Sequence, residues 1–342
     1  MAAQSPVKVK VTQIQQVCIV CNDIRKTMEA YWNILGIGPW AVFEFGSLRI
    51  PDLKYHGKFA WGRYTGAVTQ MGPIELELFE TIEGASVYQD WIDENGEGLH
   101  HMKFLVEDLD IDRVNREMES MGFPPIGGGH FGPGLKNQFA YYDLMKPLKV
   151  VWETSNRTGG NPPGAVMFPE DPNAVSPARV KVGGIKQVAI CVKDVISTAE
   201  NYWNILGIGP WEIRDCGSRV LHDRFYYDKP SWGKERVAHA YVGDLELELV
   251  QPVEGYSIYQ DWIDEHGESL HHLKFLCDDI DQVSSLMAEQ GFPSMQKGHF
   301  GDPKEKAGGF NYIDIPPLHC IWEPVHKPKS LPIKPFARVP SD

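Results

Sequence analysis

The chain has 342 residues, a formal net charge of −13 and a sequence pI of about 5.4, and 42% of its residues are hydrophobic. This length predicts two domains, and the acidic balance argues against nucleic acid and anionic membranes as partners, because both attract basic surfaces. The sequence shows no apolar run long enough to span a membrane and no signal peptide, so we expect a cytoplasmic protein. We expect its partner to be a small-molecule substrate. A homodimer is one of the assemblies open to it.

The first elements along the chain follow the order strand, helix and three strands. Alternating apolar residues predict a strand over 14–21, and Asp23 is a plausible cap for a helix that ends at Gly36. Strands are then expected over 40–45, 59–70 and 73–80, and a short helix over 86–94. A second module of the same kind begins at His101, with a helix that starts near Asp110 and stops at Gly122.

Internal repeats organise the whole chain. The ten-residue segment Tyr31–Trp40 is identical to the segment Tyr202–Trp211, at an offset of 171 residues. Within each half, a Gln or His opens a similar apolar strand, and an Asp follows seven residues later. These leading residues are spaced 85, 86 and 85 apart, at Gln16, His101, Gln187 and His272. The chain is therefore a tandem duplication of an older duplication, and we expect an α+β fold of four βαβββ modules.

The repeats and the composition together predict the domain boundaries. Residues 157–180 are rich in Gly, Pro and Asn, which indicates a linker. We expect an N-terminal arm over 1–10, a first domain over 11–156, a second domain over 181–326 and a C-terminal tail over 327–342.

A glutamate recurs near the end of the last strand of each module, among apolar residues. Burying one such carboxylate is costly unless a cation balances its charge, and four in register with the Gln and His positions predict a site. Pairing two modules gives one amide oxygen, one imidazole nitrogen and two carboxylates, which suits Zn, Ni, Mn, Co or Fe(II). The predicted metal ligands are Gln16, Glu77, His101 and Glu153 in the first half and Gln187, Glu248, His272 and Glu323 in the second. Glu75 and Glu246 are the alternatives to Glu77 and Glu248.

These motifs resemble the vicinal oxygen chelate superfamily, which includes glyoxalase I, methylmalonyl-CoA epimerase, extradiol dioxygenases and bleomycin-resistance proteins. The resemblance covers about nine-tenths of the chain and rests on the leading Gln or His, the Asp helix cap, the Tyr-Trp and Leu-Gly pairs and the terminal Glu. It implies two curved mixed-sheet cups, each built from two modules with one divalent metal at its base. Modules one and two then share a cup, or module one pairs with module four.

The resemblance implies a metal-dependent lyase or isomerase of the glyoxalase or epimerase kind. A metal that binds two neighbouring oxygens of a small substrate, aromatic or aliphatic, can stabilise an enediolate, while a glutamate moves the proton on the adjacent carbon. Glu153 and Glu323 are the expected proton carriers. The alternatives are a metal-free protein that sequesters a ligand and, ranked lower because Gln stands where a His is required, an extradiol-type dioxygenase.

Two further histidines are candidates for proton transfer. His130 and His299 each lie in a Gly-His-Phe-Gly phrase that we expect in a loop at the mouth of a cup. The competing interpretation is a glycine-rich turn with an exposed histidine. His100 and His271 precede the predicted ligands, so strand alternation directs them away from the metal and favours a supporting or core position.

Overall fold

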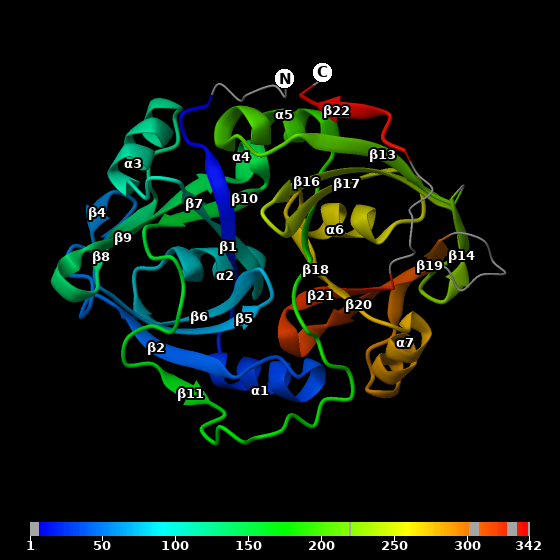
Figure 1. Ribbon diagram of the computed structural model, residues 1–342, viewed down its shortest axis with the longest axis horizontal. Helices are drawn as coiled ribbons and strands as arrows, with labels where there is room; N and C mark the ends of the chain where they lie inside the picture. The colour runs from blue at the N-terminus through cyan, green and yellow to red at the C-terminus, as the bar shows by residue number, and fades with distance from the viewer. Residues whose placement is uncertain (1–6, 219, 301–307, 327–333, 341–342) are drawn as a thin grey trace. The chain divides into compact units, whose positions relative to one another are not determined.

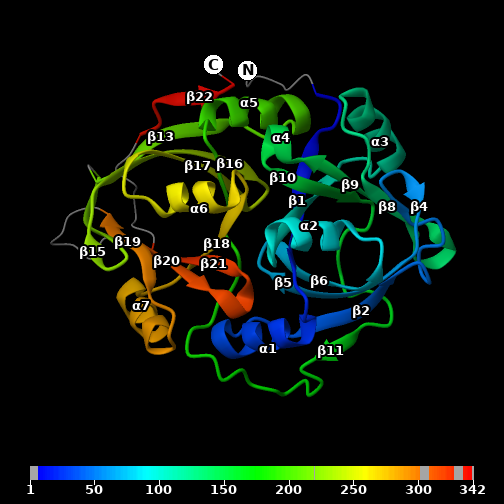
Figure 2. The same ribbon diagram turned by 180° about the vertical axis from the view of Figure 1, so that it is seen from behind.

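A computed structural model describes residues 7–218, 220–300, 308–326 and 334–340 (Figures 1 and 2). The chain divides into two compact units, one of Lys8–Lys181 with Pro317–His319 and one of Val182–Pro316 with the chain from Cys320 onward. No helix among the described residues is long and apolar enough to cross a membrane.

The first unit follows the element order that the sequence predicts. Its elements in chain order are β1 (Val11–Val20), α1 (Ile24–Leu35), β2 (Trp40–Gly46), β3 (Lys54–Tyr55), β4 (Lys58–Phe59), β5 (Gly62–Met71), β6 (Ile74–Gly84), α2 (Val87–Asn95), β7 (Gly98–Val106), α3 (Ile111–Ser120), β8 (Gly127–Phe131), η1 (Pro133–Leu135), β9 (Asn137–Leu144), α4 (Met145–Leu148), β10 (Val150–Ser155) and β11 (Val166–Phe168).

The second unit repeats this order. Its elements are β12 (Gln187–Cys191), α5 (Val195–Leu206), β13 (Trp211–Gly217), β14 (Leu221–Tyr226), β15 (Lys229–Pro230), β16 (Gly233–Val242), β17 (Leu245–Gly255), α6 (Ile258–His266), β18 (Leu270–Leu276), α7 (Ile280–Glu289), β19 (Ser294–Phe300), β20 (Gly309–Ile315), η2 (Pro316–Leu318), β21 (Cys320–His326) and β22 (Ala337–Val339).

Each unit is built on one mixed sheet. The first has the strand order β11-β2-β5-β6-β1-β7-β10-β9-β8-β3-β4, and the second has the matching order when read from β22 to β15. At the centre of the first sheet, β1 runs parallel to β6 and antiparallel to β7, and β10 runs parallel to β7. The first two modules therefore meet at β1 and β7 within one sheet, and modules three and four do the same at β12 and β18. This confirms the predicted α+β fold and selects the pairing of sequential modules.

The segments that we predicted as linker and tail both contain an edge strand. In the first unit β11 pairs antiparallel with β2, and in the second unit β22 pairs antiparallel with β13. These strands lie 171 residues apart, at Val166 and Ala337, so the repeat continues beyond the predicted domain ends. Residues 1–6 of the predicted arm and 327–333 and 341–342 of the predicted tail lie outside the described residues.

Aspartate side chains cap the first turns of α1, α3, α5 and α7. The Asp23 side chain accepts a hydrogen bond from the backbone N–H of Lys26, and Asp194 caps α5 in the same way. Gly36 ends α1 in the left-handed conformation with a φ of 67°, as its position after Leu35 predicts. In the second module the cap is Asp110 rather than the repeated Asp108, which instead binds Arg113.

Curvature gives the first sheet an inner and an outer face. In Figures 1 and 2, α1 and α3 lie on the outer side of this sheet, and α1 buries Ile24, Met28, Tyr31 and Leu35. A cluster of buried residues occupies the inner face and includes Cys18, Phe79, Tyr88 and Tyr141. The residues of α2 that pack on this cluster, Val87, Trp91 and Ile92, cover one end of the inner face.

Candidate functional site

The predicted ligands of the first unit stand on four adjacent central strands. Gln16 lies on β1, Glu77 on β6, His101 on β7 and Glu153 on β10, and all four side chains are buried. Strand register places Cys18 opposite both His101 and Glu77. Because side chains alternate between the faces of a sheet, these residues share its inner face. We call this group and the cavity above it the first cup.

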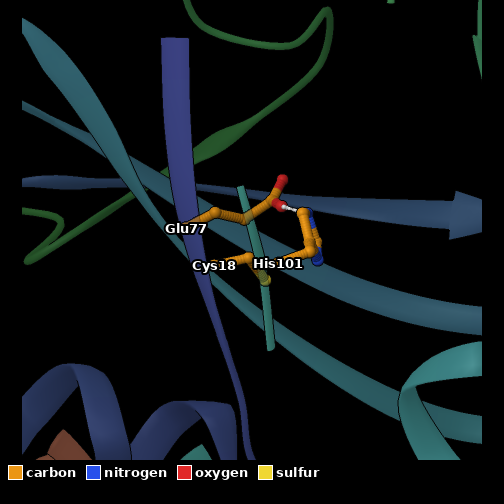
Figure 3. Close-up of side chains that lie close together, drawn as sticks. All are labelled: Cys18, Glu77 and His101. Carbon is orange, nitrogen blue, oxygen red and sulfur yellow. Dashed lines mark ion pairs between the residues drawn. The ribbon is translucent and has the colours of Figure 1, made fainter. Parts of the chain in front are cut away.

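The imidazole of His101 lies between the two carboxylates of the first cup. Its Nε2 atom is 3.5 Å from Glu77 Oε2 and 3.3 Å from Glu153 Oε2. Figure 3 shows the side chains of Glu77 and His101 directed toward each other, with Cys18 beside them. Gln16, Glu77 and Glu153 also line a cavity of about 450 Å³. Three of the four predicted ligands therefore line a ligand-sized space, and His101 lies between the two carboxylates.

The second cup repeats this geometry with Gln187, Glu248, His272 and Glu323. The Nε2 atom of His272 is 3.7 Å from Glu248 Oε2 and 3.4 Å from Glu323 Oε2. Both carboxylates line a cavity of about 220 Å³. Gln187 is fully buried, and its amide nitrogen donates a hydrogen bond to Glu246 Oε1. The alternative ligand Glu246 thus orients Gln187, whose amide oxygen stays available.

Buried polar atoms without a hydrogen-bond partner gather on these same side chains. Burial of such atoms is costly, and a bound ion is one way of satisfying them. A mixed oxygen and nitrogen set fits a divalent transition metal better than a structural zinc or a calcium cage. The atoms are Gln16 Oε1, Glu77 Oε2 and His101 Nε2 in the first cup, and Gln187 Oε1, His272 Nε2 and Glu323 Oε2 in the second.

Cys18 is a potential ligand that is absent from the set predicted from the sequence. The ligand atoms of Cys18, Glu77 and His101 all lie within 4.8 Å of one another. Burial and then the charge of Glu77 raise the pKa of the Cys18 thiol well above its ordinary value, which keeps the thiol protonated in the metal-free protein. Its spacing of two residues from Gln16 on one strand was the available signal. Ala189 occupies the matching position of the second cup, so this thiol is specific to the first.

The charges of the cups shift the ionisation of their members. Burial lowers the pKa of His101, but the nearby carboxylates of Glu153 and Glu77 outweigh burial, and the net pKa is raised. In the second cup, burial raises the pKa of Glu248, yet Lys274 and His239 bring it down to about 2. The buried Lys274 ammonium lies 3.4 Å from Glu323 Oε2 and 3.5 Å from Glu246 Oε1. Lys103 lines the first cavity and Lys274 the second, and the sequence patterns predicted neither lysine as a site residue.

Each ligand histidine is supported by the histidine that precedes it. The Nδ1 atoms of His100 and His101 are 2.9 Å apart, and those of His271 and His272 are 2.8 Å apart. Burial and the neighbouring histidine lower the pKa of His100 well below its ordinary value. Its neutral ring can therefore accept a hydrogen bond from the Nδ1–H of His101. A hydrogen bond at Nδ1 leaves Nε2 of the ligand histidine directed at the carboxylates, as metal-binding histidines require.

The two histidines proposed for proton transfer lie apart from these groups. His130 Nδ1 is 2.7 Å from Asp52 Oδ2, and the His130 backbone N–H also binds Asp52. His299 Nε2 lies 3.5 Å from Asp281 Oδ1. In the described part of the chain, the neighbouring Phe131 and Phe300 line the cavities, whereas the two histidines do not. Strand alternation on β8 and β19 explains this difference, and a role of these histidines in proton transfer stays a prediction.

The walls of the two cavities differ strongly. Phenylalanine rings surround Phe45 in the first cup, with ring centroids 5.4–6.3 Å from it. In the second cup, Arg214 and Cys216 occupy the positions of Phe43 and Phe45 on the matching strand. The first cavity is therefore suited to an apolar ring and the second to a more polar ligand. The rings that line the first cavity belong to Phe43, Phe45, Phe79, Phe131 and Phe139.

One solved structure agrees with this architecture over nearly the whole chain. A triple mutant of 4-hydroxymandelate synthase from Streptomyces coelicolor matches with a TM-score of 0.60 and 14% sequence identity over 93% of each chain. Streptomyces coelicolor methylmalonyl-CoA epimerase matches with a TM-score of 0.33 and 19% identity over 43% of this chain and 97% of that one. The uncharacterized protein YqjC of Bacillus subtilis (strain 168) is 28% identical over 89 residues, which span 25% of this chain and 64% of YqjC.

A protein-family model matches both halves of the sequence. It describes the glyoxalase/bleomycin resistance protein/dioxygenase superfamily and aligns with residues 15–142 and again with residues 186–310. These two matches contain the leading Gln or His strands and most of each inner face. This chain therefore belongs to the glyoxalase/bleomycin resistance protein/dioxygenase superfamily, as a tandem pair of its domains.

Proposed function

We propose that this protein is a divalent-metal-dependent lyase or isomerase that moves a proton next to a carbonyl group of a small oxygenated substrate. One observation carries the proposal. In the first cup, three buried atoms lack a hydrogen-bond partner, Gln16 Oε1, Glu77 Oε2 and His101 Nε2, and the side chains of Gln16 and Glu77 line a cavity. Groups arranged in this way suit a cation that keeps open positions toward the cavity.

The cation would be held by Gln16, Glu77, His101 and Glu153 in the first cup and by the matching set in the second. When bound, it would polarise a carbonyl oxygen and its oxygen neighbour and so acidify the adjacent C–H bond. The chain itself would supply the base and exclude water. Burial of the four ligands beneath the phenylalanine rings provides the low-dielectric surroundings in which such electrostatic effects are strong.

Glu153 and Glu323 are the proposed proton carriers. Both carboxylates line their cavities, and each lies within 3.4 Å of the ligand histidine. A carboxylate at this position can accept a proton from the substrate carbon and return it to a neighbouring atom. Glu77 and Glu248 stand on the opposite side of the histidine as the partner carboxylates. The proposed reactions are isomerisation, epimerisation and elimination, all of which begin with this proton transfer.

The first cup favours a substrate that carries an aromatic ring beside its oxygens. The five phenylalanine rings provide an apolar wall, while Lys103 and Arg157 add positive charge to the same cavity. A ring packed edge-on against these walls would bury apolar surface and fix the orientation of the carbonyl.

A proton-exchange experiment tests this function. The protein, supplied with Mn²⁺ in D₂O, is incubated with 2-hydroxyacetophenone or with hydroxyacetone, and loss of the CH₂ signal is followed by NMR. We expect exchange that is faster for the aromatic probe and that falls by at least about 100-fold in a Glu153→Gln, Glu323→Gln double variant. Glu83→Gln, on the exposed end of β6, is the matched control.

Two results would contradict the proposal in different ways. Exchange that survives the double substitution would remove the proton-carrier role of Glu153 and Glu323. Tight binding of the aromatic probe without any bound metal and without exchange would instead identify a protein that sequesters its ligand.

A further inference from the structure

His239 is a polar residue of the second cup that has no counterpart in the first. It lies on β16 directly opposite Glu248 of β17, whereas Val68 lies opposite Glu77 in the matching register of the first unit. Its side chain is 18% exposed and lines the cavity. The family motifs do not include this position, and the repeat pattern conceals it because the matching residue is apolar.

The carboxylate of Glu248 divides its two oxygens between two histidines. His239 Nε2 is 2.9 Å from Glu248 Oε1, and His272 Nε2 is 3.7 Å from Glu248 Oε2. An ionised carboxylate only accepts hydrogen bonds, so the imidazole of His239 must donate to Oε1. This bond fixes the plane of the carboxylate and leaves Oε2 directed at the floor of the cup.

The other three ligands of the second cup are held by the same device. Each has one atom bound by a neighbouring side chain and a second atom that faces the floor. Glu246 accepts a hydrogen bond from the Gln187 amide, His271 contacts His272 through Nδ1, and the Tyr312 hydroxyl donates to Glu323 Oε1 at 2.6 Å. Of the atoms that remain, Gln187 Oε1 and His272 Nε2 have no hydrogen-bond partner, and Glu323 Oε2 lies 3.4 Å from the Lys274 ammonium. His239 therefore completes a set of four supporting residues, one for each ligand.

We propose that His239 is a positioning residue that holds Glu248 as a metal ligand and so strengthens divalent-cation binding in the second cup. This inference rests on the proposed metal-dependent function. A ligand that is already oriented loses little conformational freedom when the ion binds, and loss of such a supporting residue typically weakens metal affinity by about 10- to 100-fold.

The first cup supplies the natural comparison. Glu77 faces Val68 across the strand pair, and the thiol of Cys18 is its polar neighbour. The substitution His239→Val therefore converts one position of the second cup into that of the first, with a residue that the same fold already accepts there. His239→Gln keeps an N–H donor on a side chain of similar reach and tests whether the hydrogen bond itself matters.

The experiment measures Mn²⁺ binding to the full chain by the EPR signal of the free ion. All variants carry His101→Ala, which disables the first cup, so that the titration reports the second. We expect His239→Val to weaken Mn²⁺ binding by about 10- to 100-fold and His239→Gln to stay close to the His101→Ala parent. His266→Gln, a substitution at the end of α6, is the control for loss of an imidazole elsewhere in the unit.

Each outcome decides between defined alternatives. Equal affinity of the parent and of His239→Val would overturn the proposal, as would an equal loss in His239→Val and His239→Gln, because the donor would then be irrelevant. Circular dichroism checks that both variants fold. If only His239→Gln folds, an affinity equal to that of the parent would support the proposal, and a loss of about 10- to 100-fold would overturn it. A parent and wild-type protein that bind no Mn²⁺ at all would instead defeat the metal-dependent function on which the inference rests.

Discussion

The hydroxyl of Tyr312 donates a hydrogen bond of 2.6 Å to Oε1 of Glu323, and the other carboxylate oxygen faces His272. Both units also have a bond between two tyrosine hydroxyls, Tyr259 with Tyr312 at 2.6 Å and Tyr88 with the matching Tyr141 at 2.8 Å, but the described contacts of Tyr141 include no bond to Glu153. The two cups therefore share their ligands but differ in how those ligands are supported. Hydrogen bonds to a charged group are worth more than hydrogen bonds between neutral groups, so this difference has measurable consequences.

Removal of the two tyrosine hydroxyls is expected to have unequal effects. Tyr312→Phe leaves the buried Glu323 carboxylate short of one donor and should lower the free energy of unfolding by about 1.5–3 kcal/mol. Tyr141→Phe removes a neutral hydrogen bond and should cost about 0.5–1.5 kcal/mol. Urea unfolding of the metal-free proteins measures both values. Equal losses would show that Glu323 is not held by Tyr312 in solution.

The phenylalanine wall of the first cup should determine its preference for a ring. Phe45→Cys installs the residue that the second cup carries at this position, Cys216, and removes contacts with the neighbouring rings. We expect binding of 2-hydroxyacetophenone to weaken about tenfold, because aromatic pairs add about 0.5–1.5 kcal/mol beyond the area that they bury. Fluorescence or calorimetric titration measures this change. Phe59→Ala, at a 78% exposed ring, is the control and should bind as the wild type does.

The sequence predicted the framework of the fold and of the site because both depend on repeated local patterns. The Asp caps, the Gly36 terminator and the eight ligand positions follow from periodicity and from the family motifs. His239 and Lys274 could not be found in this way, because their roles depend on which strands are neighbours in the sheet. The edge strands β11 and β22 lie in Pro-rich segments whose composition indicates linkers, and only pairing with β2 and β13 makes them strands.

The Phe43 ring in the wall of the first cup should make glycine necessary at position 66. A Cβ atom at this position would lie 2.4 Å from Cζ of Phe43, whereas Val237 is accepted at the matching position of the second sheet, where Arg214 replaces the ring. Gly66→Ala is therefore expected to lower the free energy of unfolding by about 1–3 kcal/mol. The double variant Gly66→Ala, Phe43→Ala should recover part of that loss. Strictly additive losses in urea unfolding would contradict this steric account.

Metal binding in the first cup should strengthen as the pH rises through the pKa of His101. Glu153 and Glu77 raise this pKa above its ordinary value of 6.5 despite burial. The protonated ring therefore stabilises the metal-free protein below pH 6.5, and that contribution is lost as the pH rises through the raised value. A metal needs the neutral ring, so the stabilisation by Mn²⁺ should be small in acid and grow at higher pH. Thermal unfolding of a His272→Ala variant with and without Mn²⁺ measures this dependence, and a pH-independent gain would contradict it.

Buried Gln, Glu and His side chains are proposed to hold a divalent cation at the floor of each cup. Elemental analysis of protein purified without chelator tests this proposal most directly, with the His101→Ala, His272→Ala double variant beside the wild type and His56→Gln as control. The account predicts divalent metal in the wild type and in the control, and its loss in the double variant. Wild-type protein that holds no divalent metal, even after supplementation, or a double variant that retains it, would contradict the account.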